Sequence, residues 1–414
     1  MSIILYAIPG FFILIAAELI AEKVRKTQYY RLNDAITSLS IGVLSRMIGV
    51  LKALVPLTVY VLIFQHLALF ELPQTVWMWI AVFVLYDFLY YWNHRFGHEM
   101  SLFWAAHVVH HSSEEYNLTT ALRQTSGSFF NFVFFLPMAL IGVDPVVLVS
   151  VASVNLVYQF WVHTRHVGKL GVLEWIMVTP SNHRVHHAQN EIYLDRNYGG
   201  VFIIWDRIFG SFQEELDTET PIYGVRKAVH SWNPFFVNIQ VYKQLIHDSY
   251  HTKRWADKLR VWFGRTGWRP DDVAAAYPLQ KVDLQQFTPY DTSITLSKKL
   301  YCVLQYVFTA IIGVYLMMNT TTLSIPHQVA IAIFVVCASV NIAWIMENRT
   351  YAIWLEWVKS AVLLAGLVFF IGLSHPVVLL LPLAVSLSLL TWVHAEHKHI
   401  NVDYAPLEQA KPNA

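Results

Sequence analysis

The sequence is poor in charged residues and in cysteine. Only 14% of its 414 residues are charged, whereas soluble domains carry about 25%, and 56% of its residues are hydrophobic. This composition excludes an ordinary soluble domain and favours a lipid bilayer as the solvent. The two cysteines, Cys302 and Cys337, are too few for a disulfide framework or a thiolate-ligated metal site. A net charge of +1 provides no concentrated basic face, so we expect no nucleic-acid partner.

Long apolar runs predict helices that cross a membrane, which takes roughly 20 residues. The first run, residues 3–20, has basic residues after it and none before it. A secretory signal peptide has the opposite arrangement, so we expect a retained membrane helix. The other predicted spans are residues 48–70, 76–91, a hairpin within 129–161 that turns at 141–145, 301–318, 328–346, 353–373 and 377–392. The predicted fold is therefore all-α, a polytopic bundle of membrane helices.

These runs divide the chain into four predicted segments. They are N-terminal transmembrane helices over residues 1–75, a histidine-rich catalytic domain over 76–215, a cytosolic segment over 216–297 and C-terminal transmembrane helices over 298–414. Counting the crossings places residues 94–111 and 163–187 on the same side of the membrane, and the positive-inside rule makes that side cytosolic. We therefore predict a multi-pass membrane protein whose active site faces the cytosol. The tail EQAKPNA carries no retention signal, which favours a bacterial inner membrane over the endoplasmic reticulum.

Histidine is concentrated in the predicted catalytic domain, where ten of the nineteen histidines fall between His94 and His187. The motifs NHRFGHE, HVVHH and HRVHH place imidazoles three or four residues apart, which puts them on one face of a helix. Such a stripe presents several neutral imidazoles to one point, as a metal site requires, and this many nitrogens exceeds the coordination of one ion. We therefore expect a site for two metal ions on the cytosolic side. The predicted ligands are His94, His98, His107, His110, His111, His163, His183, His186 and His187, with the role of His166 left open.

The residues alone leave the metal and the chemistry open. Imidazole suits iron, zinc and copper. A histidine-lined metal transporter is one alternative, but it would spread its ligands across the depth of the membrane, whereas these fall at helix ends on one side. A membrane zinc hydrolase is another, and the stretch HEMSL lacks the second histidine of the His-Glu-x-x-His zinc motif.

Two stretches of the chain carry a resemblance to a known family. They are YDFLYYWNHRFGHEMSLFWAAHVVHHSSEEYNLTTALRQ, from Tyr86 to Gln124, and the segments WVHT, LGVLEWIMVTPSNHRVHHAQN and LDRNYGGVFIIWDRIFGSFQEE within residues 161–215. Together they resemble the fatty acid hydroxylase and sterol desaturase superfamily of membrane di-iron enzymes, and most closely its alkylglycerol monooxygenase (glyceryl-ether monooxygenase) branch. The pattern departs from that branch at Asn182, where a further histidine is usual, and at His166, where an apolar or acidic residue is common.

The resemblance implies two iron ions held by the histidines named above, with O2 as co-substrate. It also implies tetrahydrobiopterin as the electron donor in the animal members. The substrate it implies is a membrane lipid, an alkylglycerol that is hydroxylated at the ether-linked carbon and then releases a fatty aldehyde. A fatty acid or sterol hydroxylase or desaturase of the same superfamily is the alternative that the ligand set leaves open.

Several polar residues outside the histidine motifs are candidates for supporting roles in catalysis or binding. Glu99 matches a glutamate of that branch and is expected to orient a ligand histidine or to touch the reductant. Asp87 lies seven residues before His94, so on a helix it shares that face and could accept an imidazole N–H. The alternative for Asp87 is a salt bridge to Arg95 or Arg123. The candidates for a lipid head-group or pterin pocket, with capping and loop hydrogen bonds as their alternative, are Asn117, Arg123, Gln124, Asp195, Asn197 and Tyr198.

Overall fold

The computed structural model describes residues 3–52, 54–127, 129–371 and 384–396. Over these residues its regular structure is helical, supplemented by isolated β-bridges such as Met177 with Phe202. This confirms the predicted all-α fold. Three of the described helices are long and apolar enough to cross a membrane, namely α1 (Ile3–Arg25), α14 (Leu296–Met318) and α15 (Ile325–Met346). The protein is therefore a multi-pass membrane protein.

The remaining elements fall between and after these spans. Those between α1 and the first histidine motif are α2 (Leu32–Lys52) and α3 (Leu54–Leu67), and α4 (Val76–Glu99) carries that motif at its end. Those around the histidines are α5 (Ser101–His111), α6 (Leu118–Ala121), η1 (Phe130–Phe135), α7 (Leu136–Ile141), α8 (Pro145–Trp161), η2 (Gly171–Trp175), α9 (Pro180–His187), η3 (Glu191–Tyr193) and α10 (Ile204–Phe209). Those that follow are α11 (Pro234–His251), α12 (Trp255–Phe263), α13 (Asp271–Ala276), η4 (Leu284–Gln286) and α16 (Thr350–Ile371).

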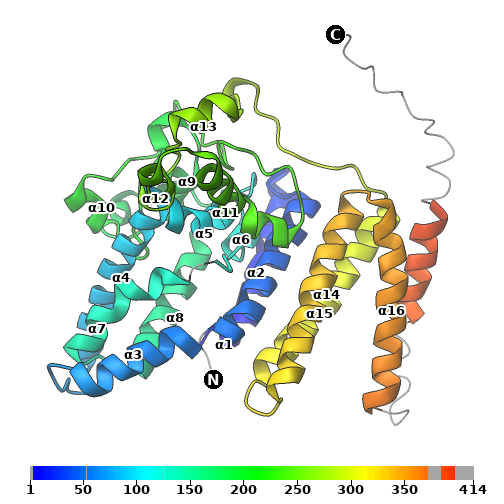
Figure 1. Ribbon diagram of the computed structural model, residues 1–414, viewed down its shortest axis with the longest axis horizontal. Helices are drawn as coiled ribbons and strands as arrows, with labels where there is room; N and C mark the ends of the chain where they lie inside the picture. The colour runs from blue at the N-terminus through cyan, green and yellow to red at the C-terminus, as the bar shows by residue number, and fades with distance from the viewer. Residues whose placement is uncertain (1–2, 53, 128, 372–383, 397–414) are drawn as a thin grey trace.

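The predicted span over residues 48–70 was wrong. Its residues belong instead to the end of α2, which ends at Lys52, and to α3, which begins at Leu54. Hydropathy missed the first half of α2 because its buried face carries small polar side chains, including Thr37, Ser38 and Ser40. In Figure 1 α2 stands between the histidine-bearing helices and α14, and α3 runs across the lower edge of the molecule.

Two other predictions about this region are confirmed, one of them with a longer helix than expected. The Thr75 side chain accepts a hydrogen bond from the Met78 N–H and so caps α4, which begins at Val76 as predicted. The helix continues to Glu99, eight residues beyond the predicted span, and therefore carries the apolar run and the first two histidines on one rigid element. The hairpin turn at 141–145 is present, because Gly142 adopts a left-handed φ of 99° and Asp144 caps α8.

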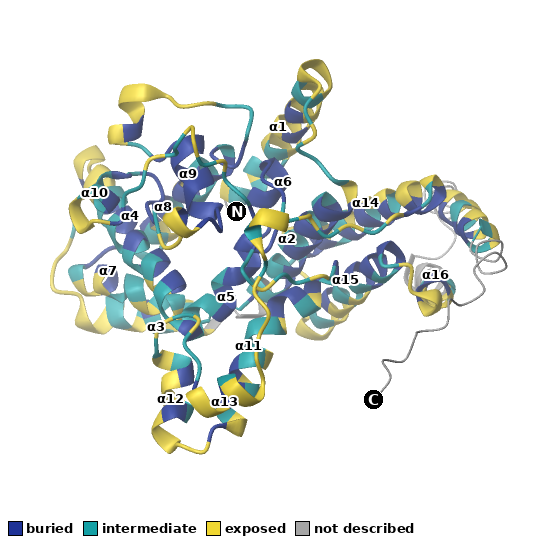
Figure 2. Cartoon of the chain, turned by 90° about the horizontal axis from the view of Figure 1, so that it is seen from above, coloured by how far each residue is buried: buried dark blue, intermediate teal, exposed yellow. Residues whose placement is uncertain are grey.

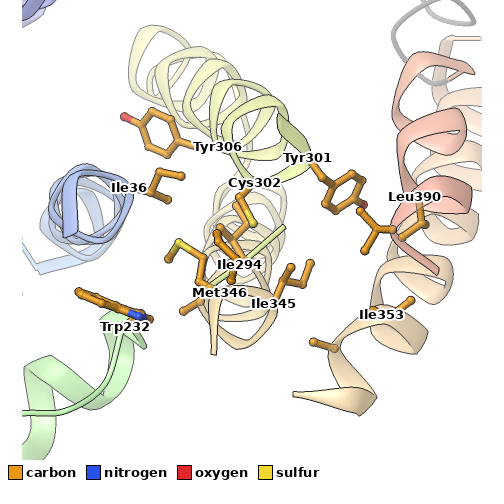
Figure 3. Packing of buried hydrophobic residues seen from close by; sticks show 14 residues of the cluster. Ile36, Trp232, Ile294, Tyr301, Cys302, Tyr306, Ile345, Met346, Ile353 and Leu390 are labelled. Carbon is orange, nitrogen blue, oxygen red and sulfur yellow. The ribbon is translucent and has the colours of Figure 1, made fainter. Parts of the chain in front are cut away.

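The C-terminal helices pack against α2 and form a bundle beside the histidine-bearing half. Figure 3 shows their core, where Ile36 of α2 lies beside Tyr306 of α14, whereas Tyr301 of α14 points the other way, toward Leu390. The predicted spans over 353–373 and 377–392 lie partly outside the described residues. Within the described part, α16 covers most of the first, and residues 384–396 are helical.

The two histidine-rich stretches meet at one end of the helices. α4 and α8 run up to that end, where α5, α6 and α9 lie, and α11 packs against α5 (Figure 1). Seen from above, α9 is largely buried, whereas α12 and α13 expose much of their outer surface (Figure 2). The predicted histidine ligands are therefore gathered in the interior of the protein, where all of them except the half-buried His107 are buried.

Candidate metal centre

The nine predicted ligands form two compact groups of imidazoles. In each group one ring nitrogen per residue lies within 4.8 Å of the corresponding nitrogens of all the others. The groups, which we call the five-histidine cluster and the four-histidine cluster, contain His94, His98, His107, His111 and His186 in the first and His110, His163, His183 and His187 in the second.

Helical geometry explains why each HX2HH motif divides between the two clusters. Residues at i and i+4 differ by only 40° around a helix, so His107 and His111 share one cluster, as do His183 and His187. The i+3 residue is rotated 60° to the other side. Accordingly His110 joins the four-histidine cluster, and His186 joins the five-histidine cluster. Each motif thereby contributes to both candidate metal sites.

The ring nitrogens converge within each cluster. The Nε2 atom of His107 lies 3.0 Å from that of His94 and 3.1 Å from that of His111. In the four-histidine cluster the Nε2 atom of His163 lies 3.2 Å from that of His110 and 3.1 Å from that of His183. Nitrogens that crowd together in this way, with no carboxylate between them, are the arrangement expected of ligands aimed at a common ion.

Backbone carbonyl groups orient the imidazoles from behind. The Nδ1 atom of His94 donates to the carbonyl of Tyr198 at 2.7 Å, and that of His186 to the carbonyl of Arg196 at 2.9 Å. In the four-histidine cluster His110 Nδ1 reaches the carbonyl of Arg123 at 3.1 Å, and His163 Nδ1 reaches that of Gln159 at 2.8 Å. Because a carbonyl only accepts, each Nδ1 carries the proton and each Nε2 presents its lone pair to the cluster.

Burial keeps these imidazoles neutral. It lowers the pKa of His110 to about 4, although the hydrogen bond to the Arg123 carbonyl opposes the change. Burial also lowers the pKa of His111, His186 and His187 well below the ordinary value of 6.5, and the charges of neighbouring imidazoles act in the same direction. Metal binding requires the neutral form, so the site is prepared for cations at neutral pH.

The two clusters are in direct contact through stacked imidazole rings. The rings of His111 and His187 stack with their centroids 4.3 Å apart and their planes 20° apart. A second stack joins His183 and His186, whose centroids are 5.1 Å apart. Because each pair contains one member of each cluster, ions held by the two clusters would be close neighbours.

Asp87 does not have the partner that we predicted. Its buried carboxylate accepts hydrogen bonds from Asn155 Nδ2 at 2.7 Å, from the N–H groups of Val201 and Phe202 at 2.8 and 3.0 Å, and from Trp205 Nε1 at 3.0 Å. Neither an imidazole nor an arginine is among these partners. The carboxylate instead fastens the loop that carries the Tyr198 carbonyl, so its influence on His94 is indirect.

Glu99 also lies away from the imidazoles. Its side chain is 37% exposed and pairs with Arg95 at 2.9 Å on the same helix. The carboxylate beside the five-histidine cluster is that of Asp195, whose Oδ1 atom lies 3.9 Å from His98 Nδ1. Asp206 was not anticipated from the sequence. It is fully buried and accepts from the N–H groups of Tyr198 and Gly199, both at 2.7 Å.

Three of the residues predicted to line a head-group or pterin pocket are engaged in structural hydrogen bonds. Asn117 caps α6 and donates to the Tyr29 carbonyl at 2.8 Å. Arg123 is buried and pairs with Asp34 at 3.2 Å. Asn197 donates to the carbonyls of Asn182 and Gln213. These contacts match the capping and loop alternative rather than ligand binding.

Tyr198 and His166 occupy contrasting positions. The ring centroid of Tyr198 is 5.3 Å from that of His98, and its buried hydroxyl has no hydrogen-bond partner among the described residues. His166 belongs to neither cluster and lies against Tyr29, with 5.0 Å between ring centroids. Tyr198 therefore borders the candidate centre, whereas His166 does not.

A cavity of about 170 Å³ borders the clusters and continues into a larger apolar groove. We call it the inner cavity; its walls include His94, His107, His110 and His163. A groove of about 810 Å³, the membrane groove, runs between α1, α2 and α14. The residues common to both are Ile4, Phe11, Arg46, Leu122 and Gln124. An apolar chain lying between membrane helices can thus extend to the histidines.

Comparison with known proteins agrees with this geometry. Residues 79–211 match the fatty acid hydroxylase family. The chain is 37% identical to alkylglycerol monooxygenase from Xenopus tropicalis over 86% of this chain and 79% of that relative. Identity to the Homo sapiens alkylglycerol monooxygenase is 34%, over 86% of this chain and 81% of the relative. The ornithine lipid hydroxylase of Rhizobium tropici is 28% identical over 31% of this chain and 40% of its own length.

No solved structure matches the chain. The identities over about four-fifths of full-length relatives extend well beyond the histidine-bearing region. Together with the two imidazole clusters, they show that the chain belongs to the fatty acid hydroxylase family.

Proposed function

We propose that the protein is an O2-dependent di-iron monooxygenase that hydroxylates the ether-linked carbon of an alkylglycerol and so releases a fatty aldehyde. Similarity to alkylglycerol monooxygenases over most of the chain carries the proposal. Two buried imidazole clusters, reached by an apolar groove between membrane helices, support it independently.

The residues present fit two iron ions. All nine donors are imidazole nitrogens, which suit iron, and no thiolate is among them. The Nε2 atoms of His98 and His187, one in each cluster, are buried without a hydrogen-bond partner in the described part of the chain. A bound cation would satisfy both. When bound, the irons would supply the O2 activation that attack on an unactivated C–H bond requires.

The proposed reaction balances with a two-electron reductant such as tetrahydrobiopterin. One atom of O2 is inserted into a C–H bond of the ether-linked carbon to give a hydroxyl group, and the other takes two electrons and two protons and leaves as water. The resulting hemiacetal then breaks its bond to the glycerol oxygen, giving the fatty aldehyde and glycerol. The chain's part is to hold neutral imidazoles in place through the carbonyls of Tyr198 and Gln159, and to admit the alkyl chain through the membrane groove.

We further propose that the site faces the cytosol. The basic end of α1 lies beside the histidine-bearing end, because Arg25 donates to the His166 carbonyl at 2.8 Å. Basic residues flanking a membrane helix mark its cytosolic end.

Two other candidate functions differ from this one in the expected placement of the ligands or in the expected product. A metal transporter would place its ligands along a path through the membrane, whereas these nine nitrogens form two compact groups at one end of the helices. A fatty acid or sterol hydroxylase shares the ligand set and would be revealed by its substrate, because an oxygenated acid or sterol would accumulate while an alkylglycerol remained intact.

The decisive experiment measures fatty aldehyde released from 1-O-hexadecylglycerol by the purified full-length protein loaded with iron, with and without tetrahydrobiopterin. We expect aldehyde only when reductant and O2 are both present. His110→Ala should abolish release, because it removes one of only four ligands from its cluster. His166→Ala is the matched control, a neighbouring histidine outside both clusters, and should retain activity. Intact ether lipid in the complete wild-type reaction would refute the proposal.

A further inference from the structure

Arg46 is a cation at the junction between the inner cavity and the membrane groove, and among the described residues it has no partner. It lies on α2, is partly buried, and lines both spaces. No described residue forms an ion pair with it or accepts a hydrogen bond from it, in contrast to Arg123, which follows α6 and pairs with Asp34. An ionisable side chain among membrane helices is costly unless it has a function, and its partner is then a ligand or another polar group.

Two amide oxygens in the inner cavity also lack partners among the described residues. Asn93, one residue before His94, is only 9% exposed, and its Oδ1 atom is buried without a hydrogen bond. The Oδ1 atom of Asn131 is likewise buried and unpaired in the described part of the chain. A buried polar atom without a partner is uncommon and points to a missing group. Gln124 lines the same cavity but has a partner, because its Nε2 atom donates to the Ala121 carbonyl at 2.9 Å.

The donor and acceptor pattern identifies the chemistry of the missing group. Arg46 offers only donors, and the Oδ1 atoms of Asn93 and Asn131 offer acceptors. A hydroxyl group both donates and accepts, so neighbouring hydroxyls can satisfy both sides at once. A phosphate ester offers acceptors and would leave the amide oxygens unpaired in this arrangement.

We propose that Arg46, Asn93 and Asn131 form a subsite that binds the hydroxyl groups of a neutral lipid head group, with the alkyl chain extended in the membrane groove. This inference rests on the proposed ether-cleaving function, because it assigns the two ends of that substrate to the two spaces. The bond between head group and chain then lies at the junction, beside the histidine wall of the inner cavity. Arg46 would be a positioning residue that selects the diol.

Binding without turnover tests this assignment. Apparent Kd values would be obtained from thermal-shift titrations of the full-length protein without O2, using 1-O-hexadecylglycerol and hexadecyl propyl ether, which lacks the hydroxyls. We expect the wild type to prefer the diol by about 10- to 100-fold, the range for hydrogen bonds to a charged group. Arg46→Met should abolish the preference while leaving affinity for the diol-free ether unchanged, because the side chain keeps its length and loses its donors.

Two further variants separate binding from structure. Asn131→Leu should weaken diol binding about fivefold, as expected for a neutral hydrogen bond. Lys23→Met, which removes an exposed basic residue of α1 outside both spaces, should change neither affinity. Arg46→Met should not lower the melting temperature, since no described partner is lost, whereas a structural role would lower it.

Several outcomes would overturn the assignment. The first is equal affinity of the wild type for the two ethers, and the second is a diol preference that is undiminished in Arg46→Met and Asn131→Leu. The third is an affinity for 1-O-hexadecylglycerol 3-phosphate that depends on Arg46 and is at least tenfold above that for the diol. Because turnover is absent from the assay, a diol preference that depends on Arg46 would stand even if no aldehyde were ever formed, and only the proposed reaction would then fail.

Discussion

The Asp87 carboxylate offers a sharp test of how the fold supports the candidate metal centre. Asp87→Ala would remove the acceptor of four hydrogen bonds, two of them from the backbone N–H groups of Val201 and Phe202. A hydrogen bond to a charged group contributes about 1.5–3 kcal/mol, and a buried donor left unsatisfied costs about 1–3 kcal/mol. These terms are not additive, and the native state also bears the cost of burying the charge. We therefore expect a loss of roughly 3–5 kcal/mol in the free energy of unfolding.

The same substitution should loosen one metal site more than the other. The loop that Asp87 holds carries the carbonyl that orients His94, so iron in the five-histidine cluster should be depleted first. Loss of a group that orients a metal ligand typically costs about 10- to 100-fold in metal affinity. Iron per chain after dialysis against a chelator, measured by mass spectrometry beside a thermal melt, would report both effects.

Glu99→Gln is the matched control for Asp87→Ala. Both carboxylates lie on α4 and were predicted to support catalysis, but Glu99 forms only a surface ion pair with Arg95. Such pairs contribute about 0–1 kcal/mol, so stability and iron content should be close to those of the wild type. Asp87→Asn, which keeps one acceptor oxygen, should fall between the two. An Asp87→Ala protein that melts with the wild type and retains two irons would refute the reasoning.

Two further predictions concern the clusters and a buried carboxylate. His187→Ala leaves three imidazoles in its cluster, whereas His107→Ala leaves four in the other. Metal analysis should therefore find more iron lost from the His187→Ala protein than from the His107→Ala protein. Equal losses would contradict the division into unequal clusters. Burial raises the pKa of Asp206 to about 6, against hydrogen bonds from Ser211 and two backbone N–H groups that lower it. The folded state therefore takes up a proton that the unfolded state does not bind as pH falls from about 6 towards 4, which stabilises the fold by roughly 1 kcal/mol per pH unit in that window. The melting temperature of the wild type minus that of Asp206→Asn should then be larger at pH 5 than at pH 7.5, and a constant difference would show that Asp206 does not titrate there.

The local sequence pattern was sufficient to predict the elements that carry long apolar runs or dense histidine motifs. The runs over 3–20, 301–318 and 328–346 correspond to α1, α14 and α15, because a spanning helix needs its apolar residues in one continuous stretch. The turn at 141–145 was equally legible from Gly142 and Asp144. By contrast α2 was obscured, since a helix buried inside a bundle can carry polar residues such as Asp34 that pair with another element.

Supporting residues were harder to predict than the histidines. Three candidates that are close in sequence to histidine motifs have other partners. Asp87 accepts from a distant loop, Glu99 pairs with Arg95 on the surface of its own helix, and Asn117 caps α6. Asp206 and Arg46 were not predicted at all, because the loop N–H groups that Asp206 accepts from and the two spaces that Arg46 lines are formed only by the tertiary structure.

The sequence by itself determined that the protein lies in a membrane and that its candidate metal ligands are histidines. Both follow from short segments, because hydropathy and the recurrence of imidazoles every three or four positions are local properties. Only the packing of α4, α5, α8 and α9 decided which imidazoles face each other, since the same motif sends neighbouring imidazoles to different clusters. Packing likewise decided which carboxylates support the centre and where a lipid can reach it, because both depend on atoms brought together from distant parts of the chain.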